Sequence, residues 1–125
     1  MKNAVNWFEI PATDLDRAVE FYSTVLGIEL QKAEFMAEPQ AFIMYDQTAV
    51  GGAIVCSDRL TPSMAGTLVY LNLETVDNLE QALSKVEPSG GKLLMEKTSI
   101  GEFGFIGMMQ DSEGNCIGLH AMQSE

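Results

Sequence analysis

Residues 8–30, FEIPATDLDRAVEFYSTVLGIEL, decide the fold. They complete a strand-like run over residues 4–12 and continue into an amphipathic segment over residues 14–26. Apolar side chains recur in that segment at helical spacing on one face: Leu15, Ala18, Val19, Tyr22, Val25 and Leu26. Thr13 or Asp14 supplies the N-cap, and Gly27 stands where a left-handed residue would end the helix. The stretch therefore predicts a strand followed by a helix.

The rest of the chain extends this pattern and then repeats it. Three strands are expected after the helix, at residues 28–36, 41–46 and 49–56, with a turn at Asp46–Gln47. After a linker, a second set of elements is expected: a strand at 67–74, a helix at 76–86, and strands at 92–97, 103–110 and 116–122. The last two strands are joined by the loop DSEGN, residues 111–115, whose glycine suits a positive φ. Gly51–Gly52 inside a strand indicates a bulge or a close approach to the backbone.

The two halves form an internal repeat. Shifting the second half back by 61 positions places Leu15 over Val76 and Tyr22 over Leu83, so the buried pattern matches. We predict one α+β domain over residues 1–125, with a first βαβββ module over 1–57, a linker over 58–66 and a second module over 67–125. Each sheet has a helix on one face only. The two modules are therefore expected to form a cup-shaped sheet whose inner face receives a ligand.

Composition excludes several classes of function. The 125 residues carry 7 Lys and Arg against 18 Asp and Glu, for a formal net charge of −11. Such a chain repels nucleic acid and anionic membranes. It has no apolar run of about 18 residues and no signal-peptide pattern, so a cytoplasmic protein is expected. In that compartment Cys56 and Cys116 are expected to be buried thiols and not a disulfide.

Three motifs carry a resemblance to a known family: FEIPATDLDRAVEFYSTVLGIEL at 8–30, LVYLNLETVDNLEQAL at 68–83 and GFIGMMQDSEGNCIGLH at 104–120. Together with the doubled βαβββ order, they resemble the vicinal oxygen chelate superfamily of glyoxalases, bleomycin-resistance proteins and dioxygenases. Among its members, the chain resembles small bacterial proteins described as related to lactoylglutathione lyase. The resemblance covers nearly the whole chain and implies the same fold.

The family's chemistry uses a divalent metal that chelates two neighbouring substrate oxygens. The resemblance places its four ligands at Trp7, at Gly52 or Ala53, at Leu68 and at Gly118, where the family usually has His, Glu, His and Glu. None of these side chains is an N or O ligand for a divalent ion. We therefore expect no metal cofactor.

Polar residues on the expected inner face are the candidates for chemistry. Strand alternation places Trp7 with Glu9, Tyr70 with Asn72, and Cys116 with Gly118 and His120. Glu9 and His120 are the candidate catalytic acid and base. Alternatively, His120 could close a strand or face water, and Glu9 could bond to nearby backbone or to a partner subunit.

The candidate ligand-binding residues are Trp7, Tyr70, Asn72 and Cys116. Trp7 offers a stacking face, although a tryptophan more often packs in a core. Tyr70 and Asn72 suit hydrogen bonds that orient a ligand, and Tyr70 is expected beside His120. A reactive Cys116 paired with His120 is the least favoured interpretation, because no positive group is evident beside the thiol.

Three functions remain open. The first is a metal-free protein that binds a small neutral or cationic organic molecule, as bleomycin-resistance proteins do, with the ligand held in a homodimer. The second is a lyase, isomerase or dioxygenase that works through a relocated metal or through acid–base chemistry by Glu9 with His120 or Tyr70. The third is an interaction module that uses the fold for dimerisation alone.

Overall fold

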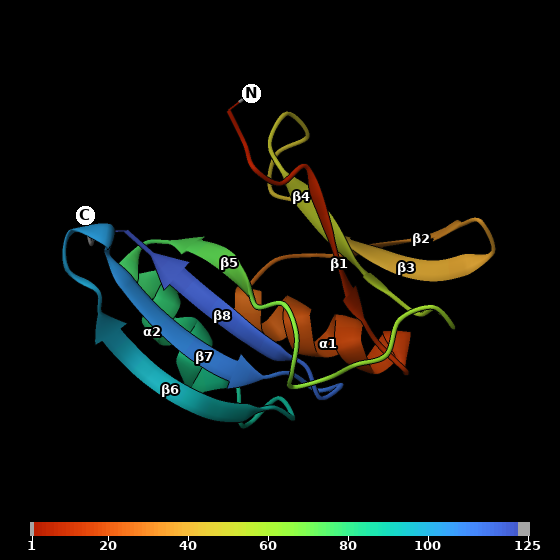
Figure 1. Ribbon diagram of the computed structural model, residues 1–125. Coiled ribbons are helices and arrows are strands. Elements are labelled where there is room, and N and C mark those ends of the chain that lie inside the picture. Colours follow the sequence, from red (N-terminus) through yellow and green to blue (C-terminus); the bar gives the residue numbers. More distant parts are fainter. Residues whose placement is uncertain (1, 123–125) are drawn as a thin grey trace.

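The computed structural model describes residues 2–122 and contains two four-stranded sheets with one helix each (Figure 1). The first half comprises β1 (Trp7–Pro11), α1 (Leu15–Leu26), β2 (Gln31–Phe35), β3 (Glu38–Ile43) and β4 (Gly51–Val55). The second half comprises β5 (Val69–Glu74), α2 (Val76–Lys85), β6 (Lys92–Ser99), the short helical turn η1 (Gly101–Phe103), β7 (Phe105–Gln110) and β8 (Cys116–Ala121). The predicted α+β fold of two tandem βαβββ modules is confirmed. Residues 1 and 123–125, at the outer ends of the predicted modules, lie outside the described residues.

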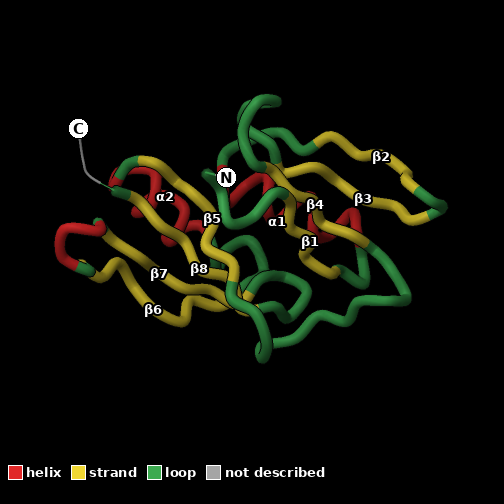
Figure 2. The backbone as a smooth tube through the Cα atoms, turned by 45° about the horizontal axis from the view of Figure 1, so that its top comes forward, coloured by secondary structure: helices red, strands yellow, loops and turns green. Residues whose placement is uncertain are grey.

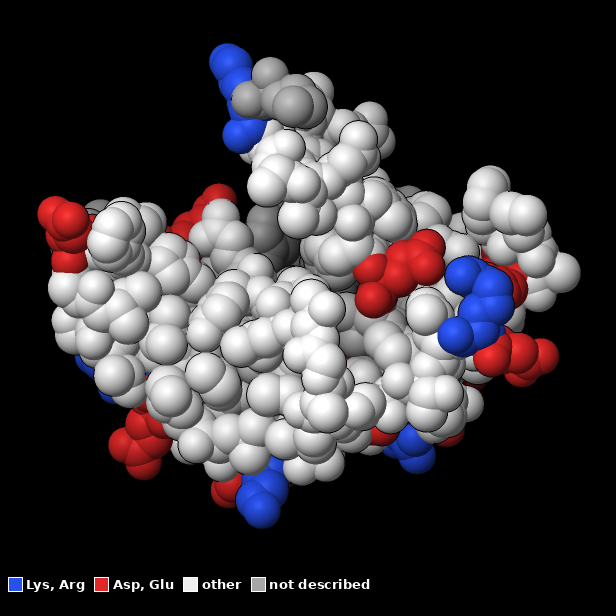
Figure 3. Space-filling view, viewed as in Figure 1, with Lys and Arg blue, Asp and Glu red and all other residues white. Residues whose placement is uncertain are grey.

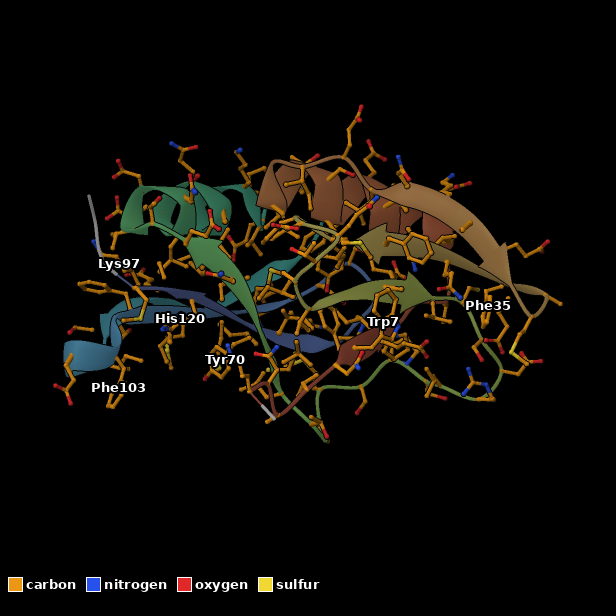
Figure 4. All side chains as sticks on the ribbon, turned by 90° about the horizontal axis from the view of Figure 1, so that it is seen from above. Trp7, Phe35, Tyr70, Lys97, Phe103 and His120 are labelled. Carbon is orange, nitrogen blue, oxygen red and sulfur yellow. The ribbon has the colours of Figure 1, made fainter. Side chains whose placement is uncertain are left out.

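Both sheets have the same topology. The strand orders are β1-β4-β3-β2 and β5-β8-β7-β6. The first strand of each half pairs in parallel with the last, and the remaining pairs are antiparallel. The sheets lie side by side with β1 and β5 towards the middle (Figure 2), and both helices cover the same side (Figure 4). We call the opposite side of the two sheets the open face.

Local sequence signals account for both helices. The Asp14 carboxylate accepts a hydrogen bond from the Arg17 backbone N–H at 3.1 Å, and Gly27 ends α1 with a φ of 71°. Thr75 caps α2 in the same way, accepting from the Asn78 N–H at 3.1 Å. Within residues 2–122, neither helix has the length and apolar character needed to cross a membrane.

The largest difference from the sequence prediction lies in the β2–β3 hairpin. The turn falls at Met36 and Ala37, whose φ values are 54° and 66°, and β3 already begins at Glu38 rather than at residue 41. Two successive left-handed residues form a turn that normally carries Asn or Gly, so no turn residue marks it in the sequence. Elsewhere the turn expected at Asp46–Gln47 is present, with Asp46 accepting from the Thr48 N–H at 2.8 Å.

The Gly51–Gly52 pair permits a close approach and does not form a bulge. β4 pairs regularly with both of its neighbours. A Cβ atom on Gly52 would lie 2.5 Å from the Phe8 ring. Gly52 therefore makes room for an aromatic side chain from the adjacent strand.

The core lies between the helices and the sheets. Its largest fully buried side chains are Tyr22, Phe21, Ile54, Leu79, Met109, Leu119, Val25, Val55 and Val86. The apolar stripe of each helix supplies part of this set, as the helical periodicity predicts. Phe21 and Tyr22 meet edge to face with ring centroids 5.2 Å apart.

The DSEGN loop between β7 and β8 reaches across to the first half. The Tyr22 hydroxyl donates to Asp111 Oδ2 at 2.5 Å in a buried contact. Asn115 Nδ2 donates to the same carboxylate at 2.9 Å and to the Pro11 carbonyl at 2.8 Å. Asn115 Oδ1 also accepts from the Ser63 N–H of the linker at 3.1 Å. One loop thus joins α1, the end of β1 and the linker.

Glu113 of the same loop binds the start of α1. Its Oε1 accepts from the backbone N–H groups of Thr13 and Asp14 at 2.9 Å each, and its Oε2 accepts from Arg17 Nε at 2.7 Å. Its side chain has no exposed surface. Burial acts to raise the pKa of Glu113, but the Arg17 guanidinium and the backbone donors outweigh it and hold that pKa at about 2.

Replacing Tyr22 with Phe should lower the free energy of unfolding by about 1–2 kcal/mol, because Asp111 loses a buried hydrogen bond. Urea denaturation followed by circular dichroism measures the change. Tyr70→Phe is the matched control, since its ring is part-exposed, and should stay within about 0.5 kcal/mol of the wild type. Equal effects of the two variants would contradict a stabilising role for the Tyr22 contact.

Glu113 should make the fold sensitive to acid. Its pKa lies below the ordinary value of 4.5, so its stabilising contribution is complete above pH 4.5 and is lost as the pH falls towards about 2. The difference in Tm between wild type and Glu113→Gln should therefore stay constant from neutral pH down to about pH 4.5 and shrink as the pH falls further towards about 2. Glu80→Gln, at an exposed ion pair with Lys97, serves as the control. A difference in Tm that does not change with pH would show that the Glu113 charge contributes nothing.

Candidate binding face

The predicted site residues lie on the open face of the two sheets. Along β5, the side chains of Leu71 and Leu73 are buried while Tyr70 and Asn72 are exposed. β1 alternates in the same way, with Ile10 buried below an exposed Glu9. Figure 4 shows Trp7 on one sheet and Tyr70 and His120 on the other, with both helices on the far side. Strand alternation predicted that Trp7 shares a face with Glu9 and that Tyr70 shares one with Asn72, and the structure confirms both.

The open face carries few charges although the chain is strongly acidic. Figure 3 shows this face with its Asp, Glu, Lys and Arg side chains mostly at the rim. Two of its aromatic side chains are well exposed, Trp7 at 38% and Tyr70 at 44%. An exposed apolar surface of this kind is typical of a binding or association site.

Tyr70 covers the place on β8 where the resemblance expects a metal ligand. Tyr70 and Gly118 are direct partners in the parallel pairing of β5 with β8. A Cβ atom on Gly118 would lie only 2.4 Å from Cδ1 of the Tyr70 ring. Because the ring occupies that space, a longer side chain at residue 118 would force Tyr70 to move.

Trp7 forms a second aromatic area on the other sheet. Its strand partner is Gly51, which has no side chain to cover it. The Phe42 ring meets Trp7 edge to face, with centroids 6.0 Å apart and planes at 73°. Phe42 was not among the predicted site residues, because a strand pairing between β3 and β4 brings it to this face.

Glu9 is a solvent-accessible carboxylate in an ion pair. Its side chain is 33% exposed, and Oε1 lies 4.0 Å from Arg59 Nη2. Arg59 also binds Glu38 at 3.1 Å. The sequence left open a catalytic role for Glu9 and a bond to nearby backbone or to a partner subunit, and this ion pair with a linker residue of the same chain was not among those expectations. The sequence did not identify Arg59, because it lies in the linker.

His120 and Asn72 are held by local backbone contacts. His120 Nε2 lies 2.8 Å from the Phe103 carbonyl, and Asn72 Oδ1 accepts from the Glu74 N–H at 2.9 Å. The register places Asn72 directly opposite His120, so the expected neighbour Tyr70 stands two residues earlier in β5, opposite Gly118. Glu9 and His120 belong to different sheets and make separate contacts, so this chain does not bring its two predicted catalytic residues together.

Cys116 and His120 are too far apart to form a thiolate–imidazole pair. They lie four residues apart in one strand, a separation of roughly 13 Å. Cys56 and Cys116 are both free thiols, as predicted, but they are partly buried and not fully enclosed. Cys116 stands at the start of β8 opposite Gln110, beside the DSEGN loop.

The residues at the four positions where the resemblance expects metal ligands do not suit a divalent ion. The pairing of β1 with β4 places Ala53, and not Gly52, on the open face beside Glu9. The four positions therefore offer an indole N–H, a methyl group, an isobutyl group and a glycine, none of which donates an electron pair to a metal. Among residues 2–122, His, Cys, Asp and Glu side chains nowhere gather in threes at metal-binding distance.

Comparisons with known proteins agree with this architecture. The sequence profile of a family described as the Glyoxalase/Bleomycin resistance protein/Dioxygenase superfamily matches residues 4–119. A glyoxylase-like domain-containing protein of Didymella fabae is 33% identical over 121 residues, covering 89% of this chain and 88% of that protein. The protein CFP32 of Mycobacterium tuberculosis (strain CDC 1551 / Oshkosh) is 24% identical over 91% of this chain, which spans only 44% of that relative's length.

A solved structure shows the same fold. The glyoxalase/bleomycin resistance protein from Albidiferax ferrireducens T118 superposes with a TM-score of 0.73, covering 95% of this chain and 98% of that one. The two sequences are 14% identical. At this distance the likeness concerns the fold and says nothing about the ligand.

The contact between Tyr70 and Gly118 can be tested by a double-mutant cycle. Gly118→Ala should lower the free energy of unfolding by roughly 1–3 kcal/mol, because the new methyl group overlaps the Tyr70 ring. In a Tyr70→Ala background the same change should cost less than half as much. Urea denaturation of the four proteins measures both values. An equal cost in the two backgrounds would mean that the ring does not lie over Gly118.

Proposed function

Because this chain belongs to the glyoxalase/bleomycin resistance protein/dioxygenase superfamily, we propose that it binds a small organic molecule on the open face without the family's divalent metal. The Tyr70 ring lying over Gly118 is the observation that carries this proposal. At that position the chain has an aromatic surface where the family has a ligand for the metal. A relative that lost the metal but kept the shape of the site would retain binding.

The ligand that suits this face is flat, apolar in part, and neutral or positively charged. Tyr70 on one sheet, and Trp7 with Phe42 on the other, offer aromatic surfaces for stacking. The acidic chain attracts cations and repels anions. A planar cation would also gain from the π faces of both aromatic areas.

A second copy of the chain is the proposed cover for this face. Each chain has a formal net charge of −11, so two copies repel one another across most of their surfaces. On the open face this repulsion is reduced, because its charged side chains stand mostly at the rim (Figure 3). A homodimer joined there would enclose the aromatic surfaces and keep water from the ligand.

Native mass spectrometry of the untagged protein tests this proposal. We expect a metal-free dimer that retains an additional organic mass. One divalent ion for each chain would overturn the metal-free part and favour the alternative function, a metal-dependent enzyme of this family. A monomer would contradict the proposal that two copies of the chain enclose the ligand.

Binding by the open face can be tested with proflavine, a flat aromatic cation, in equilibrium dialysis. Tyr70→Leu should weaken binding about tenfold, because the stacking surface over Gly118 is lost. Phe35→Leu is the matched control, since it removes an exposed aromatic ring at the far end of the molecule (Figure 4) and should leave the affinity within about twofold. Equal affinities for the two variants would contradict an open-face site.

A further inference from the structure

A cavity of about 420 Å³ lies at the seam between the two halves. Its walls come from the C-terminal end of α1, the loop after β3, the end of β5 and one side of α2. Val25, Leu73 and Ala82 form a buried apolar floor. Of the predicted site residues only Asn72 lines it, so the cavity is separate from the aromatic surfaces of the open face. Its volume is typical of a site for a small molecule.

Two negative features line this cavity, the C-terminus of α1 and the Glu74 carboxylate. α1 ends there at Leu26 and Gly27, and its last turn contains no basic residue to balance the partial negative charge of the helix terminus. Glu74 adds a carboxylate at the end of β5. Burial raises the pKa of the neighbouring Tyr45 hydroxyl, and the Glu74 charge raises it further, so the two groups lie close together.

One positively charged side chain also lines the cavity. Lys85 lies in the last turn of α2 and lines the cavity together with the amides of Asn78 and Gln81. A cavity lined by both a carboxylate and an ammonium group matches a molecule that carries both charges. The apolar floor between them would accommodate an aliphatic side chain.

The backbone of Glu74 is unusual. Its φ is 72°, in the left-handed region, and β5 is irregular between Asn72 and Glu74. The Asn72 side chain secures this conformation by accepting the Glu74 N–H, and the Tyr45 hydroxyl donates to the Asn72 carbonyl at 2.9 Å. Gly or Asn adopts such a conformation at lower cost than Glu. A glutamate at this position is therefore consistent with a use for its carboxylate.

We propose that this cavity is a second binding site, for a small zwitterion such as an amino acid or a dipeptide. The ammonium group lies between the Glu74 carboxylate and the terminal carbonyls of α1. The carboxylate of the ligand faces Lys85, and an aliphatic side chain covers Val25 and Leu73. The site does not depend on the function proposed for the open face.

Titration of the full-length ¹⁵N-labelled protein with glycyl-leucine tests the site. Saturable shifts are expected at the amides of Gly27, Ile28, Glu74 and Gln81. N-acetyl-glycyl-leucine, which lacks the ammonium group, should bind at least about tenfold more weakly. Equal binding of the two peptides, or the absence of saturable shifts at these amides, would overturn the proposal.

Variants separate binding from folding. Glu74→Gln should weaken glycyl-leucine binding at least about tenfold. Glu80→Gln is the matched control, because Glu80 lies on α2 but does not line this cavity, and it should leave the binding unchanged. Glu74→Asn should raise Tm because Asn adopts the left-handed conformation more readily, and it should still lose binding. Binding that survives Glu74→Gln would contradict the assigned role of the carboxylate. Shifts confined to the region of Tyr70 would place the peptide on the open face instead.

Discussion

The buried contact between Tyr22 and Asp111 is the interaction on which the rest of the structure depends. Each half of the chain is a small sheet with one covered face, and a unit of that size buries too little apolar surface to be stable alone. Asp111 accepts from Tyr22 across the seam, and Asn115 joins the same carboxylate to the end of β1. Within residues 2–122, no buried side-chain nitrogen or oxygen lacks a hydrogen-bond partner. A polar network of this kind specifies one arrangement of the two halves, because any other would leave buried groups unsatisfied.

That arrangement accounts for the shape of the molecule. With Glu113 bound to the start of α1, the two helices lie on the same side and in contact with one another. Both sheets are then free on their other side, which produces the open face and brings the aromatic residues of the two halves to one surface (Figure 4). The seam also creates the cavity between α1, β5 and α2. The same fold can thus carry a different chemistry from its relatives, since a few side chains on one surface decide what binds there.

The repeat, the helices and the faces of the strands could be predicted because each rests on a regular local period. Helical spacing of apolar residues identified α1 and α2, and alternation placed Tyr70, Asn72 and Glu9 on the open face. The hairpin turn at Met36 and Ala37 could not be predicted, because these residue types seldom adopt left-handed backbone. The distances between the candidate site residues could not be predicted from the sequence either. Cys116 and His120 share a face but lie four residues apart, and Arg59 reaches Glu9 from a linker with no periodic pattern.

The amino-acid sequence by itself determined the order of the elements, the doubling of the module, the family and the residue types at the four positions where the resemblance expects metal ligands. Each of these follows from residue types and from spacing between near neighbours in the chain. Only the tertiary structure decided that the DSEGN loop holds α1, that Tyr70 lies over Gly118 and that Glu74 faces a cavity. Tyr22 and Asp111 are 89 residues apart, and Tyr70 and Gly118 meet only because β5 pairs with β8. Contacts of this kind depend on how complete helices and strands pack in space, so no local pattern in the sequence predicts them.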